Sequence, residues 1–470
     1  MPAVIDPTST AFLLAESRSM PMHVGGLQLF EPPAGAGPGY AREMYEQMRD
    51  AAEISPLFRK HPARSLKAAG QLVWKNDDDL DIEHHVRHSA LPAPGRVREL
   101  LELCSRLHST RLAHERPLWE AHVIEGLDDG RIALYTKLHH ALVDGVSAMR
   151  LMASTLTGDE DRRDMPAPWA TQHRPTRAPT EPPSAPGLTN LAGVTASTVR
   201  SALAIATDAA GLPGAFTRTM VKGLRNETSA VSFHAPRTIL NRTITGSRRF
   251  AAQDWPVERL KAVGAASGTT LNDVVLAMCA GALRSYLLEL DALPEAPLIA
   301  MVPVSLGGRD VGTPSADGGN SVGSVMCQLA THLDDPARRL GAVHTSMKDG
   351  KKALATMSST QVLAMSALGL APVVVNPLLR LQGIARPPFN LVISNVPGPR
   401  TTQYWNGARL VGAYPLSIPV DGMGLNITCT SYDGQLAFGL TGCRRTVPSL
   451  QRMLTHLDDE LAALEKAVGV

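Results

Sequence analysis

Apolar and polar residues alternate over two short segments in the first third of the chain. Residues 119–126 and 131–137 both show the two-residue period of a half-buried strand. The sequence Asp-Asp-Gly at 128–130 lies between them and is a turn signal, so the two segments are predicted to form a hairpin. The next apolar run, residues 146–152, has the spacing of a helix. The second strand therefore leads through a short loop into a helix.

From about residue 231 onward, predicted strands and helices follow one another. Residues 298–304 and 389–395 are apolar runs typical of buried strands. A helix is expected from Asn272 to Leu288, with a threonine just before it as the N-cap. Residues 449–467 place leucines and a methionine on one stripe of an amphipathic helix. This mixed order of elements predicts an α/β or α+β architecture in each half of the chain.

A proline-rich segment separates the two halves. Seven prolines fall between Pro166 and Pro186, which is typical of an extended, surface-exposed connector. Residues 188–222, rich in alanine and leucine, are expected to form one or two helices that cross between the halves. A domain usually has roughly 100–200 residues. We therefore predict an N-terminal domain over residues 1–157, a linker over 158–230 and a C-terminal domain over 231–470.

Composition narrows the class of protein. The 46 Lys and Arg residues balance 44 Asp and Glu residues, without the basic excess of a nucleic-acid-binding protein. The five cysteines contain no C-x-x-C pair, so neither a disulfide framework nor a zinc site is expected. The first residues do not resemble a signal peptide, and prolines interrupt the uncharged stretch 353–379. We expect a cytoplasmic protein that is not secreted and does not span a membrane.

The loop after the second hairpin strand carries candidate chemistry. His139 and His140 are followed by Asp144 and Gly145. An imidazole at a strand end can accept a proton near neutral pH, and the carboxylate can fix the loop or the ring. The glycine is expected to allow a backbone turn that a side chain would block. A purely structural histidine pair is the alternative. A metal site is not predicted, because neighbouring strand residues point to opposite faces and no H-E-x-x-H spacing is present.

A second histidine pair offers an internal comparison. His84 and His85 follow an acidic run, and Ser89-Ala90 stand where the first pair has Asp-Gly. We expect residues 83–88 to be a solvated or structural strand.

The run HHALVDG at 139–145 resembles the H-H-x-x-x-D-G motif of coenzyme A-dependent acyltransferases, which include chloramphenicol acetyltransferase-like enzymes and condensation domains. Further segments resemble the wax ester synthase/diacylglycerol acyltransferase family, in order and spacing over essentially the whole chain. These segments are Phe12-Leu13 with Glu16, and residues 21–27, 117–120, 272–275, 302–305, 319–320 and 394–399.

One position departs from the family pattern. The resemblance leads us to expect an arginine directly after the sequence VPVSL, but Gly307 and Gly308 precede Arg309 here. If an arginine pairs with Asp144, the partner is Arg309 or one of the two arginines at 248–249.

The resemblance implies two chloramphenicol-acetyltransferase-like α/β domains packed face to face, with the site in a tunnel at their junction. It implies transfer of a long-chain acyl group from acyl-CoA to a long-chain alcohol, to diacylglycerol or to both. His140 would be the general base, with His139 and Asp144 mainly in support. Acyl-CoA is a substrate, and no cofactor is expected. Oxyanion donors are expected from the second half; the candidates are Asn272, Ser394 and Asn395.

The uncharged residues 361–379 are a candidate for the tunnel wall. Two prolines interrupt a helix there, and the small residues Ala367, Gly369 and Ala371 leave space on one face. A buried core helix is the alternative. Because the expected substrates are lipids, we predict peripheral contact with the inner face of the membrane or with lipid bodies.

Two other functions remain open. One is a condensation-type acyltransferase that uses a carrier-protein thioester. The other is a non-catalytic lipid-binding protein built on the same fold.

Overall fold

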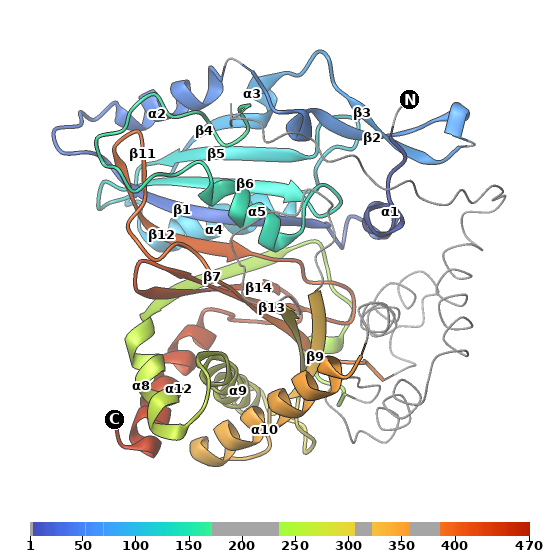
Figure 1. Ribbon diagram of the computed structural model, residues 1–470, viewed down its shortest axis with the longest axis vertical. Coiled ribbons are helices and arrows are strands. Elements are labelled where there is room, and N and C mark those ends of the chain that lie inside the picture. The colour runs from blue at the N-terminus through green and yellow to red at the C-terminus, as the bar shows by residue number, and fades with distance from the viewer. Residues whose placement is uncertain (1–2, 52, 69, 172–234, 306–321, 358–385) are drawn as a thin grey trace.

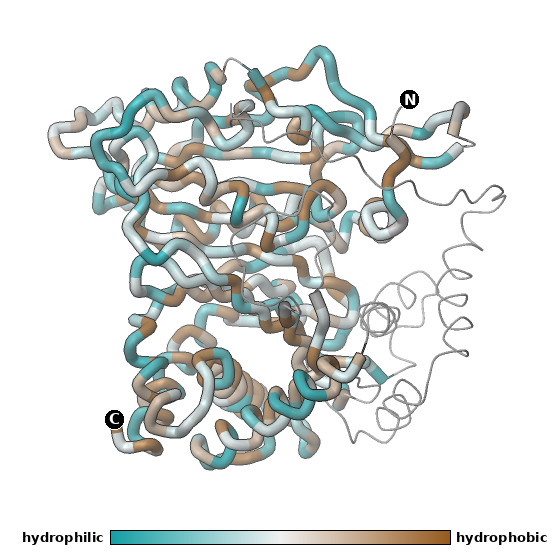
Figure 2. Tube along the Cα trace, in the orientation of Figure 1, coloured by the Kyte–Doolittle hydropathy of each residue, from teal (hydrophilic) through white to brown (hydrophobic). Residues whose placement is uncertain are grey.

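Two six-stranded sheets, each with its own helices, lie one above the other in the computed structural model (Figure 1). Figure 2 shows hydrophobic residues along the strands of both sheets. The structure describes the chain except residues 1–2, 52, 69, 172–234, 306–321 and 358–385.

The N-terminal sheet contains the predicted hairpin. Its strands β5 and β6 pair antiparallel, as predicted. Two helices, α2 (Tyr40–Arg49) and α5 (Gly145–Ala153), pack with residues of one sheet face, and α4 (Val97–Ser109) packs on the other. The strand order is β11 (Tyr404–Trp405), β12 (Ala408–Leu416), β1 (His23–Glu31), β6 (Ile132–His139), β5 (Trp119–Glu125) and β4 (Val86–Ala90).

The C-terminal sheet is covered on one face by four helices, which enclose the largest apolar core. The predicted helix at 272–288 is α9, and Thr270 caps it by accepting a hydrogen bond from Asp273 N. The predicted amphipathic C-terminal helix is α12. The strand order is β7 (Arg248–Pro256), β14 (Gln435–Cys443), β13 (Leu425–Tyr432), β10 (Leu391–Val396), β8 (Ile299–Ser305) and β9 (Val322–Gln328). The helices are α8 (Val257–Ser267), α9 (Leu271–Glu289), α10 (Pro336–Ala355) and α12 (Arg452–Val468).

Helix α9 is, within the described chain, the one helix long and apolar enough to cross a membrane by length and composition. It is mostly buried and packs against α8, α10 and α12 inside the C-terminal body. Its apolar sequence is therefore accounted for by its place in this core.

Two features differ from the predicted division of the chain. β11 and β12 come from the second half, yet they complete the N-terminal sheet, where β12 pairs antiparallel with β1. The start of the proline-rich segment is also not a surface connector. Trp169 is 1% exposed and donates its indole N–H to Met48 O at 3.0 Å. The N-terminal body thus extends to residue 171, and the boundaries within 172–234 stay a prediction.

The second histidine pair has a structural place. His84 and His85 lie in α3 (Ile82–His85), because Asp81 caps this turn by accepting His84 N, so the predicted strand begins only at Val86. The buried His85 ring stacks on Trp119 at 4.7 Å between centroids, and its Nδ1 lies 2.8 Å from Trp119 O. The structural interpretation is confirmed, and the strand assignment of the pair is wrong.

Smaller elements complete the N-terminal body. Helix α1 (Pro7–Ala15) lies beside a separate two-stranded sheet, which consists of β2 (Lys60–Arg64) and β3 (Leu72–Asn76). The described part of this body also contains the short 3-10 helices η1 (Pro56–Arg59) and η2 (Leu66–Ala68), whereas η4 (Ile239–Asn241) belongs to the C-terminal body, where Leu240 joins the core.

Apolar residues of both bodies meet at the end of β6. Met22 just before β1, Val24 in β1 and Ala148 of α5 share a cluster with Phe389 and Val392 from the second half. The loop between β6 and α5 therefore lies at the junction of the two bodies.

Candidate active site

His140 directly follows β6, and the fold holds it from two sides. Its backbone amide donates to Met22 O at 2.8 Å. Its ring stacks on Phe12 of α1, with centroids 4.2 Å apart and an interplanar angle of 27°. Phe12 also packs against the junction cluster. The imidazole is therefore fixed between α1 and the loop where the two bodies meet.

The surroundings of His140 keep its ring neutral. Burial lowers the pKa of His140, and the carboxylate of Asp144 opposes this effect only in part. The net pKa lies below the usual value of 6.5. A neutral imidazole can accept a proton at physiological pH, as a general base must.

His139 is a buried support for the same loop. Its Nδ1 accepts a hydrogen bond from Ala141 N at 3.0 Å. Burial lowers the pKa of His139 to about 4, so the ring is neutral. Because Nδ1 is the acceptor, the single ring proton is on Nε2. This nitrogen faces the carboxylate of Glu16, 3.7 Å from Oε1.

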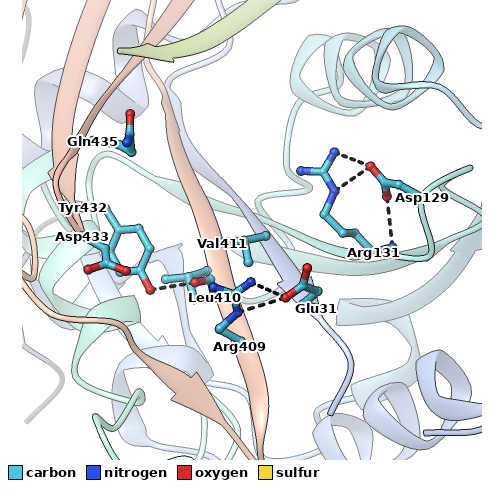
Figure 3. Close-up of a pocket in the computed structure, with 9 residues that line it drawn as sticks. All are labelled: Glu31, Asp129, Arg131, Arg409, Leu410, Val411, Tyr432, Asp433 and Gln435. Atoms are coloured by element: carbon cyan, nitrogen blue, oxygen red, sulfur yellow. Dashed lines mark hydrogen bonds and ion pairs between the residues drawn. The ribbon is translucent and has the colours of Figure 1, made fainter. Parts of the chain in front are cut away.

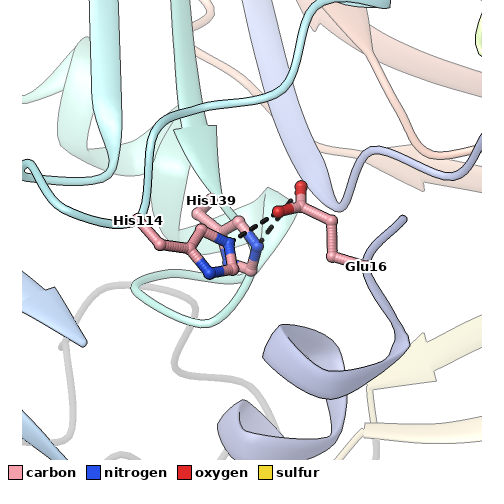
Figure 4. A group of neighbouring side chains, drawn as sticks. All are labelled: Glu16, His114 and His139. Atoms are coloured by element: carbon pink, nitrogen blue, oxygen red, sulfur yellow. Dashed lines mark hydrogen bonds and ion pairs between the residues drawn. The ribbon is translucent and has the colours of Figure 1, made fainter. Parts of the chain in front are cut away.

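Glu16 and His114 complete a group that sequence reasoning did not identify (Figure 4). His114 Nε2 lies 2.6 Å from Glu16 Oε2, and Met22 N donates to Glu16 Oε1 at 3.0 Å. Burial alone would raise the pKa of Glu16, but the hydrogen bond from His114 and the facing histidines outweigh it and lower the pKa. Met22 thus connects the two residues: its amide donates to Glu16, and its carbonyl accepts from the amide of His140. The sequence signal that could have identified Glu16 is its position as a single carboxylate directly after the apolar run AFLLA.

The same three side chains, Glu16, His114 and His139, have the composition of a metal-ligand set. The tautomer of His139 argues against that use. A histidine binds a metal through an unprotonated ring nitrogen, whereas the Ala141 amide occupies the lone pair of Nδ1 and leaves the proton on Nε2. The group is better described as a polar support beneath the loop that carries His140.

Asp144 shapes the loop by capping α5. Its Oδ1 accepts a hydrogen bond from Ser147 N at 2.7 Å, which fixes the start of the helix that follows the loop. The role of Asp144 in supporting His140 stays a prediction. Two suggested arginine partners are used elsewhere. Arg248 donates to the carbonyl oxygens of Thr245 and Ser19, and Arg249 lies 3.9 Å from Glu102. Arg309 lies outside the described residues.

The reason predicted for Gly145 is wrong. Gly145 is the first residue of α5, and its φ is not among the positive values of the described chain. A Cβ atom there would meet Val24 Cγ1 at an ordinary 3.9 Å. The backbone therefore does not require glycine at this position.

The oxyanion candidates of β10 lie on opposite sheet faces. Ile393 belongs to the helix-covered core, whereas Val392 belongs to the junction cluster. Because successive strand residues alternate, Ser394 shares the junction face with Val392. Asn395 faces the helices instead. Ser394 is in register with Thr428 of β13, which belongs to a row of buried polar side chains.

Asn272 is the second residue of α9, on the helical side of the C-terminal sheet. Among the described residues, no hydrogen bond joins the side chains of Asn272, Ser394 or Asn395 to His140. Their roles stay predictions. The tunnel candidates Ala367, Gly369 and Ala371 lie outside the described residues.

The turn after β10 has a steric reason for its glycine. A Cβ atom on Gly398 would lie 2.2 Å from Ser431 O, so a side chain there would collide with the backbone of β13. At least this part of the segment 394–399 is explained by packing.

Figure 3 shows a surface pocket whose lining does not include this loop. It is lined by two arginine–carboxylate pairs, Arg409 with Glu31 and Arg131 with Asp129. Glu31 ends β1, whereas His23 at its start pairs with His139. At about 3.4 Å per residue, the length of β1 places the pocket roughly 25 Å from the histidine pair. It is not the site of His140.

Family comparison agrees with the motif and the fold. Residues 5–275 match the catalytic domain of the wax ester synthase/diacylglycerol acyltransferase family, and residues 318–465 match its C-terminal domain. The chain belongs to this family. The predicted family and the predicted class of enzyme, an acyltransferase, are thereby confirmed.

Relatives of this acyltransferase match it over nearly its whole length. A putative diacylglycerol O-acyltransferase of Mycobacterium tuberculosis is 52% identical over 99% of this chain and 100% of the relative. A probable diacylglycerol O-acyltransferase of the same organism, tgs2, is 50% identical over 99% of both chains.

Solved structures confirm the two-domain α/β fold class. The wax ester synthase/diacylglycerol acyltransferase from Marinobacter aquaeolei is 42% identical, with a TM-score of 0.79 over 100% of both chains. The first condensation domain of the CDA synthetase is 16% identical, with a TM-score of 0.56 over 100% of this chain and 96% of that one. The condensation domain thus shares the fold.

Proposed function

We propose that this acyltransferase moves a long-chain acyl group from acyl-CoA directly to the hydroxyl of a long-chain alcohol or of diacylglycerol, with His140 as general base. The observation that carries the proposal is a neutral imidazole at the junction of the two bodies. Its ring stacks on Phe12, and the backbone amide of His140 donates to Met22 O. The names of the relatives support diacylglycerol as an acceptor.

The reaction needs one proton carrier. His140 takes the proton of the acceptor hydroxyl while its oxygen attacks the thioester carbonyl carbon. The tetrahedral intermediate then collapses, the carbon–sulfur bond breaks, and the thiolate of coenzyme A takes the proton back from His140. A thiol pKa near about 8.5 makes the thiolate a fairly good leaving group. No covalent acyl-enzyme is required.

The support beneath His140 fits this chemistry. His139 accepts from the backbone amide of Ala141, and Glu16 accepts from the amide of Met22, whose carbonyl accepts from His140 N. Asp144 caps the helix that follows. Ser394 is the oxyanion candidate that lies on the junction face of β10, and an oxyanion needs such preorganised donors. The wall of the acyl channel is proposed to include Ala367, Gly369 and Ala371, on the sequence argument alone.

We further propose a peripheral enzyme on the cytoplasmic face of the membrane or on lipid bodies, where diacylglycerol and long-chain alcohols accumulate. Acyl-CoA is a substrate in this scheme, and the chemistry calls for no cofactor.

The test is a competition assay on the purified full-length protein. Palmitoyl-CoA is supplied with hexadecanol and diacylglycerol together, and both ester products and released coenzyme A are measured. Formation of either ester from free acyl-CoA supports the proposal, and their ratio gives the preferred acceptor. Turnover only with a carrier-protein thioester would favour a condensation-type enzyme. Tight acyl-chain binding without turnover would favour a lipid-binding protein.

A further inference from the structure

The β2–β3 hairpin stands apart from both large sheets. It forms a sheet of its own, paired from Lys60↔Asn76 to Arg64↔Leu72, and projects at the edge of the molecule beside α1 (Figure 1). A hairpin of two strands is at best marginally stable alone. The N-terminal residues support this one, because Ile5 N donates to Leu72 O and Trp74 N donates to Ala3 O, both at 3.0 Å.

Exposed apolar side chains gather on these elements. Leu66, in the turn of the hairpin, is 96% exposed, the highest value among the exposed large apolar residues of the described chain. Val4 and Leu14 are 54% and 47% exposed. Val4 bridges to Val73 of the hairpin, and Leu14 is in α1. Single exposed leucines are common, but this group lies on neighbouring elements of one edge.

The charge of the hairpin has one sign. Residues 60–76 contain three lysines and Arg64 but no aspartate or glutamate. Among the described side chains, no carboxylate forms an ion pair with Lys60, Arg64 or Lys75. The nearest acidic run, residues 77–79, begins at the base of the hairpin, directly after β3. Strands of five residues at about 3.4 Å each put the turn roughly 15 Å away, beyond the Debye length of about 8 Å at physiological salt.

The hairpin is joined to the catalytic loop by packing. Leu72 and Trp74 share an apolar cluster with Phe12, Ala141 and Leu142. Phe12 stacks on His140. Any partner that binds the hairpin would therefore lie close to the loop that carries the proposed base.

We propose that the β2–β3 hairpin docks this enzyme on an anionic lipid surface, with Leu66 entering the headgroup region and the basic side chains, Arg64 foremost, facing the lipid phosphates. An exposed apolar tip flanked by cations fits such a surface, because burial of the apolar group and attraction to anionic lipid act together. This inference rests on the proposed function, since it brings the enzyme to the phase that contains its acceptor.

The test is sedimentation of the full-length protein with vesicles of phosphatidylcholine, with and without phosphatidylglycerol. Wild type is expected to bind the anionic vesicles and to lose binding as salt is raised. Arg64→Glu changes the net charge by two units. Each unit is expected to alter the partition coefficient about fivefold, so binding should fall on the order of 20-fold. Leu66→Asp should also reduce binding severalfold. The matched control is Leu290→Asp, which places the same change on a 39% exposed leucine after α9.

Binding is measured separately from turnover, so the two proposals can fail independently. Both hairpin variants should keep the wild-type melting temperature and wild-type turnover of a soluble short-chain alcohol. Wild-type binding by folded Arg64→Glu and Leu66→Asp, or equal binding of wild type to neutral and anionic vesicles, would overturn the docking role. Dissociation of a wild-type dimer by Leu66→Asp would also overturn it, in favour of a second copy of the chain. Absence of ester formation by wild type on any substrate would instead contradict the proposed function.

Discussion

The backbone amide of Ala141 donates to Nδ1 of His139 at 3.0 Å. This contact uses the lone pair of Nδ1 and assigns the ring proton to Nε2, which faces Glu16 at 3.7 Å. His139 therefore has no free lone pair with which to act as a second base. The adjacent His140 is left as the proton acceptor. Two neighbouring histidines thus receive different tasks from the hydrogen bonds around them.

His140→Ala should therefore lower kcat by about 10²–10⁴-fold, the usual contribution of a general base, with a wild-type melting temperature. His139→Ala should cost less activity. The measurement is release of coenzyme A from palmitoyl-CoA with hexadecanol. His84→Ala, in the second histidine pair, is the control and should keep full activity. A folded His140→Ala enzyme with more than about half of wild-type turnover would contradict the mechanism.

Glu16→Ala tests the support beneath the loop. The change leaves Met22 N and His114 Nε2 without their partner, and an unsatisfied buried group typically costs about 1–3 kcal/mol. The free energy of unfolding should fall accordingly. Because Met22 O holds His140 N, kcat should also fall, by up to about 10²-fold for a misplacement on the order of 1 Å.

Glu16→Gln separates position from charge. The amide oxygen can still accept from Met22 N, so this variant should recover much of the stability and kcat that alanine loses, with KM close to wild type. If Glu16→Ala matched wild type in both unfolding and kcat, Glu16 would have no positioning role.

Asp144 has two separable effects, a helix cap and a charge. Asp144→Ala removes the cap of α5 and should cost about 1 kcal/mol of unfolding free energy. Asp144→Asn keeps a capping oxygen but removes the carboxylate that raises the pKa of His140. The acid limb of the kcat/KM profile should then move to lower pH, because His140 stays deprotonated further into acid. An unchanged limb in Asp144→Asn would show that the limb reports another group.

The sequence was sufficient where the signal is local. The hairpin at 119–137 follows from alternation and an Asp-Asp-Gly turn, and α9 follows from apolar spacing behind Thr270. It was insufficient where contacts join distant segments. The pairing of β12 with β1 and the contact of Glu16 with His114, 98 residues apart, leave no local pattern. Gly145 shows the opposite kind of error. The motif suggested that this position needs the backbone freedom of glycine, but Gly145 begins a helix with ordinary backbone geometry.

The buried histidines predict how stability depends on pH. Burial lowers the pKa of His85 to about 4, of His108 to about 3 and of His139 to about 4. Unfolding returns each to about 6.5, so the unfolded chain binds more protons below that pH. Stability is therefore fully present above pH 6.5 and is lost as pH falls toward 4. Glu460, whose pKa is raised by burial, opposes this trend as a single group.

These three histidines alone contribute up to roughly 4 kcal/mol per pH unit to the slope between pH 6 and 5. The measurement is urea unfolding at pH 7, 6, 5.5 and 5. His85→Phe keeps a ring beside Trp119 but cannot titrate, so its slope should be smaller by about 1.4 kcal/mol per pH unit. His332→Phe is the control, because the same substitution at an exposed histidine should leave the slope unchanged. Equal slopes in wild type and His85→Phe would mean that His85 titrates normally in the folded protein.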